Sequence, residues 1–279
     1  MQGRERPLIV LLAAAETSAS VLYGLYDVLL SVGAVFPDMT AGTPGDETLD
    51  VQIATADGQP IHCVGNVPVE PHAALGDIET PDALVVCDMY TPIGTPPTGR
   101  YPSEVAALRT AHAQGALLAS VCTGSLLLAE AGLLDGREAA THWAYRDLFA
   151  RSYPKVRLRD EQALCLSSEA ESIITAGGVT AWHDLAIHLI GRFCGQRHAI
   201  ETAKVFLISG HAEGQSPYAV FASRPTGEDR VVDDAQQWLA GNYAVSNPVE
   251  RMAERSGLST RTFARRFRRA TGHSPMEYL

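Results

Sequence analysis

The sequence lacks the cysteine pairs that a disulfide framework or a structural zinc site would require. Its five cysteines are an odd number and include no C-x-x-C pair: Cys63, Cys87, Cys122, Cys165 and Cys194. They are therefore expected to be free thiols in a reducing compartment. Low-complexity tracts are also absent, since 46% of the 279 residues are hydrophobic and 19% are charged, as in an ordinary globular protein.

No apolar run reaches the length of a membrane-spanning helix. The run at residues 8–15 follows Arg4 and Arg6, so it has the layout of a signal peptide as well as that of a buried strand. We favour the strand because residues 18–33 continue as an amphipathic helix, which is the entry that a parallel sheet needs. A cytoplasmic protein without a membrane partner is therefore expected.

Apolar strands alternate with helices through the first two hundred residues. Strands are predicted at 8–14, 49–56, 83–87, 117–121, 156–159, 163–166 and 172–175, with a short hairpin at 59–69. Helices are predicted at 19–32, 103–114, 125–131, 143–152, 180–193 and 199–209. This alternation predicts a doubly wound, flavodoxin-like α/β fold with a parallel sheet, whose ligand site lies at the carboxyl ends of the strands.

The central stretch of this pattern, residues 117–125, is an apolar strand that ends in a cysteine. Small residues stand two before and two after Cys122, at Ser120 and Gly124, as the tight turn of a nucleophile elbow requires. The helix expected from Ser125 would direct its amide dipoles at the sulfur and favour the thiolate. Because free cysteines are also among the most buried residues, an inert core thiol is the alternative.

The character of the sequence changes after residue 210. Residues 211–229 carry Gly, Pro and Ser without helical periodicity and are interpreted as a linker. Residues 230–279 are predicted to form a small all-α domain, with helices at 231–243 and 248–255 and a third that is capped by Ser259. Phe263 and Phe267 form the buried side of the third helix. The spacing is that of a helix-turn-helix.

Positive charge is concentrated at the C-terminal end of an acidic chain. Residues 249–279 contain seven arginines and three acidic residues, whereas the whole chain has a net charge of −10. Arg261, Ala264, Arg265 and Arg268 share one stripe of the third helix. Arginine on such a face pairs with guanine edges or phosphates, so these four residues are the predicted DNA contacts. A solvated arginine face is the alternative.

Two motifs resemble known families. The first, Cys122-Thr123-Gly124 with Thr141-His142-Trp143 beginning nineteen residues after the cysteine, resembles the PfpI-like branch of the class I glutamine-amidotransferase-like superfamily over residues 7–210. The second resembles the AraC-type DNA-binding domain, through Met252-Ala253, Gly257-Leu258-Ser259, Phe263, Phe267, Gly272, Ser274-Pro275 and Tyr278-Leu279. Together they resemble the GlxA-type transcriptional regulators. This implies an amidase-like sensor domain at 1–210, a linker at 211–229 and a helix-turn-helix domain at 230–279.

The resemblance implies roles for particular residues of the first domain. Cys122 matches the nucleophile of the family, and His142 matches the histidine near it. Val21 stands where the enzymes carry a carboxylate, with Glu16 in the same loop as a candidate substitute. Asp88 stands where they carry a glycine pair, and its charge opposes a developing oxyanion. The implied ligand pocket consists of Cys122, Thr123, His142, Glu16, Val21, Asp88, Met89 and Tyr90.

Two further groups of residues are open to two interpretations. Trp143, Trp182 and Tyr90 either wall the pocket or belong to the core. The second group, His183, Asp184 and His188, lies near one helix end, but its spacing does not place all three side chains on one face. A structural role is therefore predicted for this group, and neither a metal nor a cofactor is expected.

These features predict a transcriptional regulator whose α/β domain senses a small molecule or a thiol-reactive signal, without catalysis, and whose helix-turn-helix binds operator DNA. The alternatives are a cysteine-dependent hydrolase or hydratase resembling isonitrile hydratase, which would use Cys122 and His142, and a scaffold with a vestigial pocket. In AraC-type domains a long helix leads to a second helix-turn-helix, and this sequence stops where that helix is expected to begin. Either the sequence is a fragment or a homodimer assembles the DNA contacts.

Overall fold

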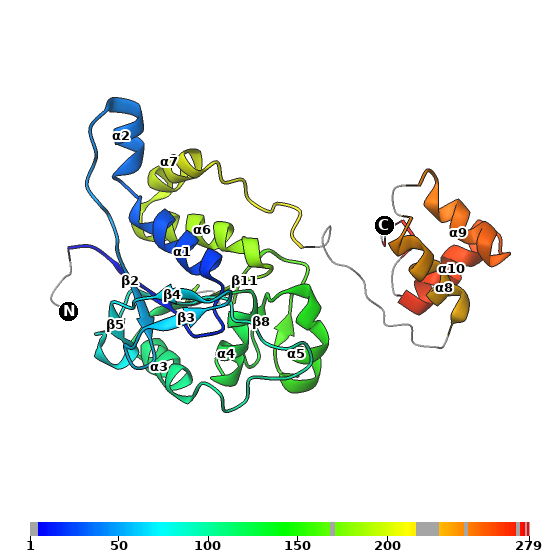
Figure 1. Ribbon diagram of the computed structural model, residues 1–279, viewed down its shortest axis with the longest axis horizontal. Coiled ribbons are helices and arrows are strands. Elements are labelled where there is room, and N and C mark those ends of the chain that lie inside the picture. The colour runs from blue at the N-terminus through cyan, green and yellow to red at the C-terminus, as the bar shows by residue number, and fades with distance from the viewer. Residues whose placement is uncertain are drawn as a thin grey trace. The chain divides into compact units, whose positions relative to one another are not determined.

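The computed structural model describes residues 5–167, 171–215, 229–242, 245–271, 274–276 and 278. The chain divides into two compact units, Met1–Pro217 and Tyr218–Leu279, which Figure 1 colours from blue to yellow and from orange to red. Of the predicted linker at 211–229, residues 216–228 lie outside the described residues. Each unit is considered by itself.

The first unit is built on a seven-stranded sheet with the strand order β10-β11-β7-β6-β1-β2-β5. Its strands are β1 (Leu8–Leu12), β2 (Asp50–Thr55), β5 (Ala73–Ala74), β6 (Ala83–Val86), β7 (Leu117–Val121), β10 (Leu164–Leu166) and β11 (Ile173–Ala176). Neighbouring strands are parallel except β10 and β11, which are antiparallel. The predicted flavodoxin-like sheet is confirmed, with one correction: its β10 edge is antiparallel.

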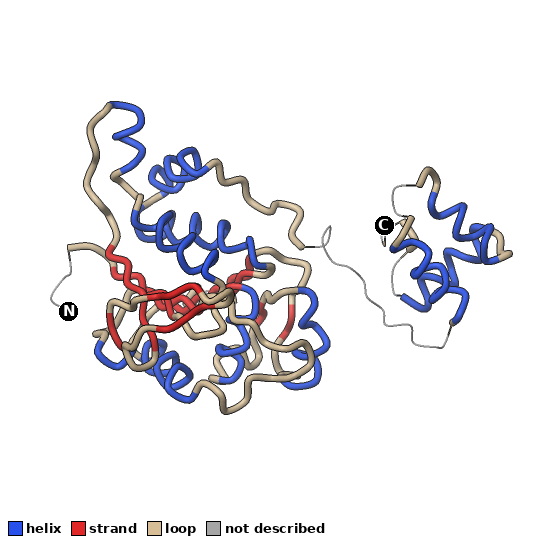
Figure 2. The backbone as a smooth tube through the Cα atoms, viewed as in Figure 1, coloured by secondary structure: helices blue, strands red, loops and turns tan. Residues whose placement is uncertain are grey.

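Helices cover both faces of this sheet, so the strands form a single central layer (Figure 2). One face packs against α1 (Ala19–Leu30) and α6 (Trp182–Cys194), and the other against α3 (Pro102–Ala113), α4 (Ser125–Glu130) and α5 (Arg146–Ser152). Along β1, Ile9 and Leu11 enter the first core cluster while Val10 and Leu12 enter the second. Burial on both faces is why this strand reads as a continuous apolar run.

Smaller elements complete the first unit. The predicted hairpin is present as β3 (Ile61–Cys63) paired antiparallel with β4 (Val67–Val69), and β8 (Glu138–Ala139) pairs parallel with β9 (Arg157–Leu158). Beside α7 (Gln196–Phe206) lies α2 (Val35–Ala41), a helix that the sequence pattern did not predict. It contains no buried residue, so it carries no apolar stripe to recognise.

The described helices were also compared with the dimensions of a membrane span. None is by itself long and apolar enough to cross a membrane; α1 and α2 meet the criterion only when taken together, as a pair bent by 61°.

The second unit contains three described helices: α8 (Arg230–Ala240), α9 (Pro248–Ser256) and α10 (Thr260–Thr271). They enclose one small core, made of Val232, Ala235, Leu239, Met252, Ala253, Phe263 and Phe267. Gly257 ends α9 in the left-handed conformation, with φ of +69°. The Ser259 hydroxyl accepts a hydrogen bond from the Thr262 N–H at 3.3 Å and so caps α10 as predicted.

Candidate functional site

The predicted elbow is present at the end of β7. Cys122 has a φ of +53°, a left-handed conformation that is uncommon for a residue other than glycine, and it begins the short 3-10 helix Cys122–Gly124 that leads into α4. A Cβ atom on Gly124 would lie 2.5 Å from the Val86 carbonyl oxygen and 2.8 Å from that of Cys87. Gly124 is therefore needed because the turn passes directly against the end of β6.

The loop that follows β6 is fastened to the elbow by one side chain. The Thr123 hydroxyl donates to the Met89 carbonyl oxygen at 2.6 Å and accepts from the Met89 N–H at 3.0 Å. The Tyr90 N–H in turn donates to the carbonyl oxygen of Glu16, at 2.7 Å, in the loop after β1. Loops from three neighbouring strands thus meet at the carboxyl edge of the sheet, as the sequence predicted. The Met89 N–H, however, is already occupied by Thr123.

Asp88 lies in the same loop with its side chain almost completely buried. One carboxyl oxygen, Oδ2, accepts from the Ser18 hydroxyl at 2.6 Å, whereas Oδ1 is buried without a hydrogen-bond partner among the described residues. Burial raises the pKa of the carboxyl, and the hydrogen bond from Ser18 only partly opposes this. Asp88 therefore offers an unsatisfied acceptor, which costs free energy until a donor reaches it.

The thiol of Cys122 is neutral at physiological pH. Burial, together with the nearby Asp88 carboxylate, raises its pKa to about 12, and hydrogen bonds from Thr123 lower it only in part. The predicted stabilisation of the thiolate by the helix that follows is therefore outweighed. With 4% of its surface exposed, the sulfur pays a desolvation cost on ionisation that outweighs the helix terminus.

His142 lies next to a residue that is fixed to the elbow. The Thr141 hydroxyl donates to the Cys122 carbonyl oxygen at 3.2 Å, and Ser125 Oγ is 2.8 Å from both that carbonyl oxygen and Thr141 Oγ1. His142 Nδ1 accepts from the Ala144 N–H at 3.2 Å, so in the neutral ring the proton is on Nε2.

The imidazole ring of His142 is half-buried among aromatic rings. Its centroid is 5.0 Å from that of Trp143 and 6.4 Å from that of Tyr145. Burial lowers the pKa of His142 and so favours the neutral ring. Among the described residues, no hydrogen bond joins the Cys122 sulfur to His142 or to a carboxylate.

The other residues of the implied pocket have different surroundings. Val21 is fully buried in the core beside the sheet, and the Glu16 carboxylate pairs with Arg100 at 2.6 Å rather than with the thiol. Tyr90 is 68% exposed. Trp182 packs into the space left by Gly24, where a Cβ atom would lie 2.6 Å from the indole ring, so it belongs to the core.

Asp184 and His188 of α6 each lie near a group of opposite polarity from another segment. Asp184 accepts from the backbone N–H of His211 at 2.9 Å and lies 2.6 Å from its Nδ1. His188 Nε2 is 3.8 Å from the Glu171 carboxylate. The described residues contain no cluster of three or more His, Cys, Asp or Glu side chains that could hold a metal ion. A structural role for these residues stays a prediction.

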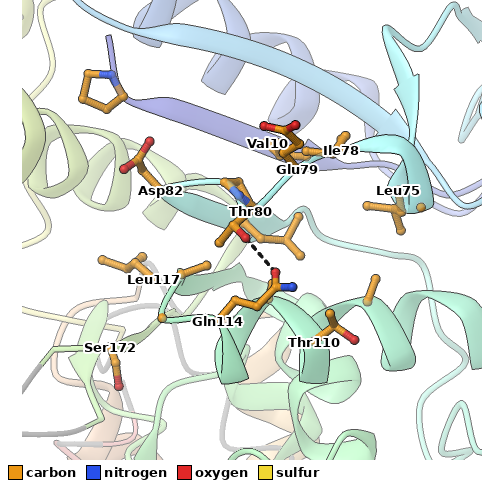
Figure 3. A pocket seen from close by; sticks show the side chains of 18 of the residues that line it. Val10, Leu75, Ile78, Glu79, Thr80, Asp82, Thr110, Gln114, Leu117 and Ser172 are labelled. Carbon is orange, nitrogen blue, oxygen red and sulfur yellow. Dashed lines mark hydrogen bonds between the residues drawn. The ribbon is translucent and has the colours of Figure 1, made fainter. Parts of the chain in front are cut away.

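A pocket in the first unit lies away from this site. About 1810 Å³ in volume, it opens at the amino-terminal edge of the sheet, beside the starts of β6 and β7, where Thr80 donates to Gln114 Oε1 at 2.8 Å (Figure 3). Parallel α/β sheets bind their ligands at the opposite, carboxyl edge. The candidate site is therefore the elbow and its three neighbouring loops.

The arginine stripe of the second unit is exposed. Arg261, Arg265 and Arg268 are open to solvent and Ala264 is partly so, while Phe263 and Phe267 are buried on the other side of α10. Arg266 differs because its guanidinium forms an ion pair with Asp229, at the start of α8. The pattern predicted from the sequence is thus the exposed surface of α10.

Comparison with protein families follows the division into two units. Residues 10–192 match the model of the DJ-1/PfpI family. The chain belongs to the DJ-1/PfpI family. Residues 239–279 match the model of bacterial regulatory helix-turn-helix proteins of the AraC family. The two-part resemblance read from the motifs is confirmed.

Individual relatives of this DJ-1/PfpI chain include regulators and an enzyme. The HTH-type transcriptional regulator CdhR of Pseudomonas aeruginosa is 32% identical over 66% of this chain and 52% of its own length. The isonitrile hydratase of Pseudomonas putida is 28% identical over 85% of this chain and 92% of its own. The chain thus spans about half the length of CdhR.

Among solved structures, an AraC family transcriptional regulator from Pseudomonas putida superposes with a TM-score of 0.58. It is 18% identical, and the match covers 72% of this chain and 99% of that one. At this identity the likeness concerns the fold of the DJ-1/PfpI unit alone.

Sequence reasoning missed two side chains of the site in this DJ-1/PfpI chain. Ser18 holds Asp88, and Gln215 contacts the backbone of Thr141. In the sequence, Ser18 was interpreted only as the start of a helix, and Gln215 lay in the predicted linker. Neither carries a local signal, because each partner is about seventy residues away along the chain.

We expect the reaction of Cys122 with iodoacetamide to accelerate about tenfold for each pH unit between about pH 7 and pH 10, because only the thiolate reacts. Burial raises the pKa of this thiol to about 12, so the rate should not level off in that range. A short unstructured peptide with one cysteine and blocked ends, whose thiol pKa is roughly 8.5, is the control and should level off. Mass spectrometry of the Cys122 peptide measures the rate. A plateau below about pH 9 would contradict the neutral thiol.

Proposed function

We propose that this chain acts as a DNA-binding transcriptional regulator of AraC type in the cytoplasm, with the DJ-1/PfpI unit as its effector-sensing part. The observation that carries the proposal is the exposed stripe of Arg261, Arg265 and Arg268 on the second helix of a helix-turn-helix. The match to the AraC family model and the similarity to a protein named as an HTH-type regulator support it.

DNA contact follows from the chemistry of this stripe. The second helix of a helix-turn-helix enters the major groove, where arginine pairs with guanine and with flanking phosphates. Arg261 and Arg265, one turn apart, would reach base edges, with Ala264 between them close to the bases and Arg268 at a phosphate. A helix-turn-helix reads a short half-site, so a homodimer that presents this unit twice would bind two half-sites.

Effector sensing is assigned to the carboxyl edge of the sheet, around Cys122 and His142. Both groups are neutral at physiological pH, and Asp88 Oδ1 is an unsatisfied acceptor in the neighbouring loop. A small molecule with a hydrogen-bond donor would satisfy that acceptor, which favours binding there. The effector is thus expected to be a small molecule that carries a hydrogen-bond donor.

The alternative is a cysteine-dependent hydrolase or hydratase in which Cys122 is the nucleophile and His142 its partner. The coverage of 92% of an isonitrile hydratase and the elbow itself favour it. Against it stand the neutral thiol, the Met89 N–H that Thr123 occupies and the Glu16 carboxylate that pairs with Arg100. The pH profile of Cys122 alkylation discriminates between the two, because a nucleophile must ionise near neutral pH.

Replacing Arg261 or Arg265 with alanine is expected to weaken binding to operator DNA from the upstream region of its own gene by about 5- to 150-fold each, since one base contact contributes roughly 1–3 kcal/mol. Arg197→Ala, an exposed arginine of the DJ-1/PfpI unit, is the matched control and should bind as the unsubstituted protein does. Binding is measured by fluorescence anisotropy at one fixed salt concentration. If both variants bind normally, the assignment of α10 as the DNA-reading helix fails.

A further inference from the structure

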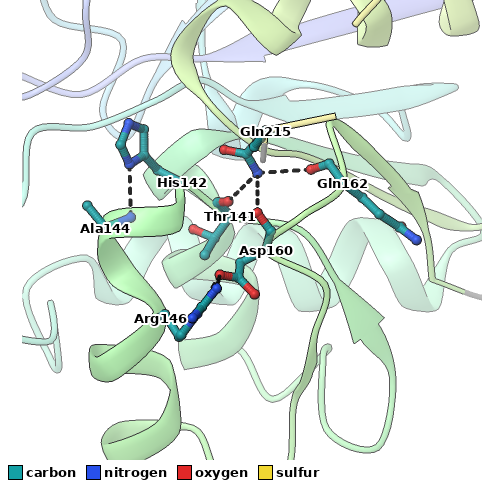
Figure 4. Close-up of polar contacts among 7 residues, drawn as sticks. All are labelled: Thr141, His142, Ala144, Arg146, Asp160, Gln162 and Gln215. Carbon is teal, nitrogen blue, oxygen red and sulfur yellow. Dashed lines mark hydrogen bonds and ion pairs between the residues drawn. The ribbon is translucent and has the colours of Figure 1, made fainter. Parts of the chain in front are cut away.

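Gln215 is held by the backbone of the DJ-1/PfpI unit at several points. Its side-chain amide Nε2 lies 2.9 Å from the carbonyl oxygens of Thr141 and Gln162 and 3.1 Å from that of Asp160 (Figure 4). Its backbone N–H donates to the Glu161 carbonyl oxygen at 2.8 Å. Only 5% of its surface is exposed. Gln215 is thus inserted into the unit rather than lying on its surface.

The surrounding backbone is shaped to admit this side chain. A Cβ atom on Gly177 would lie 2.1 Å from Gln215 Nε2, so only glycine leaves room for the amide. Gly214, immediately before it, has a φ of +66° and passes so close to the Glu161 carbonyl oxygen that a Cβ atom would lie at 2.2 Å. The chain therefore turns into this position through glycines that no larger residue could replace without displacing the backbone.

Thr141 connects Gln215 to the candidate site. Its carbonyl oxygen accepts from Gln215, its hydroxyl donates to the Cys122 carbonyl oxygen, and His142 is the next residue. A movement of the Thr141–His142 backbone on ligand binding must therefore change the contact with Gln215. Among residues 211–215, the described residues at the start of the predicted linker, Gln215 is the one that is buried.

The amide group of Gln215 has more acceptors around its nitrogen than it has protons, and no donor at its oxygen. Two amide protons are shared among three carbonyl oxygens, so the contact to Thr141 can be released while the other two remain. At the same time Gln215 Oε1 is buried without a partner among the described residues. An unsatisfied buried acceptor disfavours the arrangement by itself. The contact between Gln215 and Thr141 is thus one that the side chain can give up at low cost.

The segment that begins here leads to the DNA-reading unit. Residues 216–228 follow Gln215, and Asp229 then caps α8 by accepting from the Val232 N–H at 3.3 Å. The same carboxylate pairs with Arg266 of α10. Gln215, just before residues 216–228, is therefore hydrogen-bonded to the loop of the candidate site. Asp229, just after them, is paired with the helix that carries the arginine stripe.

We propose that Gln215 is a positioning residue of the Cys122–His142 site that links the state of the site to the segment leading to the helix-turn-helix. The proposal rests on the proposed function of the two units. Ligand or thiol chemistry at Cys122 shifts Thr141, Gln215 loses or changes its contact with the Thr141 carbonyl oxygen, and the backbone at Gly214 and Gln215 is loosened. By linkage, loosening Gln215 shifts the Thr141–His142 backbone toward the same altered state, in which Cys122 is more accessible.

The first test uses the unsubstituted protein and iodoacetamide as the probe. Alkylation of Cys122 is expected to increase the hydrogen–deuterium exchange of the Gly214 and Gln215 amides at least about tenfold, while the Ala116 and Leu117 amides at the opposite sheet edge stay unchanged. Protein alkylated in a Cys122→Ala background controls for modification of the other cysteines. Exchange at Gln215 that stays within about twofold, or that rises equally over the whole unit, overturns the proposal.

The second test changes Gln215 and measures the effect at Cys122. Gln215→Leu should raise the alkylation rate of Cys122 about tenfold or more relative to that of Cys194, which lies in α6. Gln114→Leu removes a glutamine hydrogen-bonded at the other sheet edge and should leave this ratio unchanged. If Gln215→Leu does not fold, Gln215→Met keeps the length of the side chain without its donor. An unchanged ratio in a folded variant contradicts the link. Neither test involves DNA, so a failure of DNA binding leaves both results standing.

Discussion

Replacing Gly124 with alanine is expected to destabilise the DJ-1/PfpI unit by about 3 kcal/mol, at the upper end of what overpacking usually costs. The added Cβ atom would lie 2.5 Å from the Val86 carbonyl oxygen and 2.8 Å from that of Cys87. Both contacts are with backbone at the end of a central strand, so neither neighbour can rotate away. The elbow and β6 must separate, and the left-handed turn at Cys122 is lost with them.

The destabilisation is measured as a shift of the urea midpoint of the first unit, followed by the fluorescence of Trp143 and Trp182. Gly76→Ala is the matched control, because a Cβ atom at Gly76 meets nothing within 4 Å and needs no left-handed backbone. It should change the midpoint little. Equal midpoints for the two variants would mean that the elbow does not depend on its close approach to β6.

The sheet was predictable because its central strands are buried on both faces. Residues 8–14 and 83–87 are continuous apolar runs, and the structure places β1 and β6 within them. The edges of the fold were less predictable: β10 runs antiparallel, and α2 has no buried side chain to mark it. Burial on both faces leaves a clear pattern in the sequence, whereas an edge strand or an exposed helix does not.

The candidate site was predictable where it follows a local motif and not where it depends on distant contacts. The elbow geometry could be read from Ser120, Cys122 and Gly124, because a tight turn imposes small residues at fixed spacing. The state of the thiol could not. Its pKa is raised by burial and by the charge of Asp88, a residue of the loop after β6 that only the folded chain brings near the sulfur. Gln215 escaped for the same reason, since Thr141 is 74 residues away.

Replacing Phe267 with alanine is expected to unfold the helix-turn-helix unit and abolish DNA binding without removing an arginine. Phe267 is fully buried, with its ring centroid 5.5 Å from that of Phe263 and 5.0 Å from that of Tyr278. Truncating a buried phenylalanine costs about 3–5 kcal/mol. A unit of roughly sixty residues is only marginally stable, so this loss equals or exceeds its whole stability.

The unfolding is measured by scanning calorimetry and by hydrogen exchange of the α9 and α10 amides, while those of β1 and β7 should keep their protection because that core is separate. Arg269→Ala, an exposed residue two positions further along the same helix, is the matched control and should leave the fold intact. The comparison separates the two ways of losing DNA binding: Phe267→Ala removes the helix, whereas Arg265→Ala removes a contact from a folded one. A Phe267→Ala protein that still binds operator DNA normally would show that α10 is not held in place by this core.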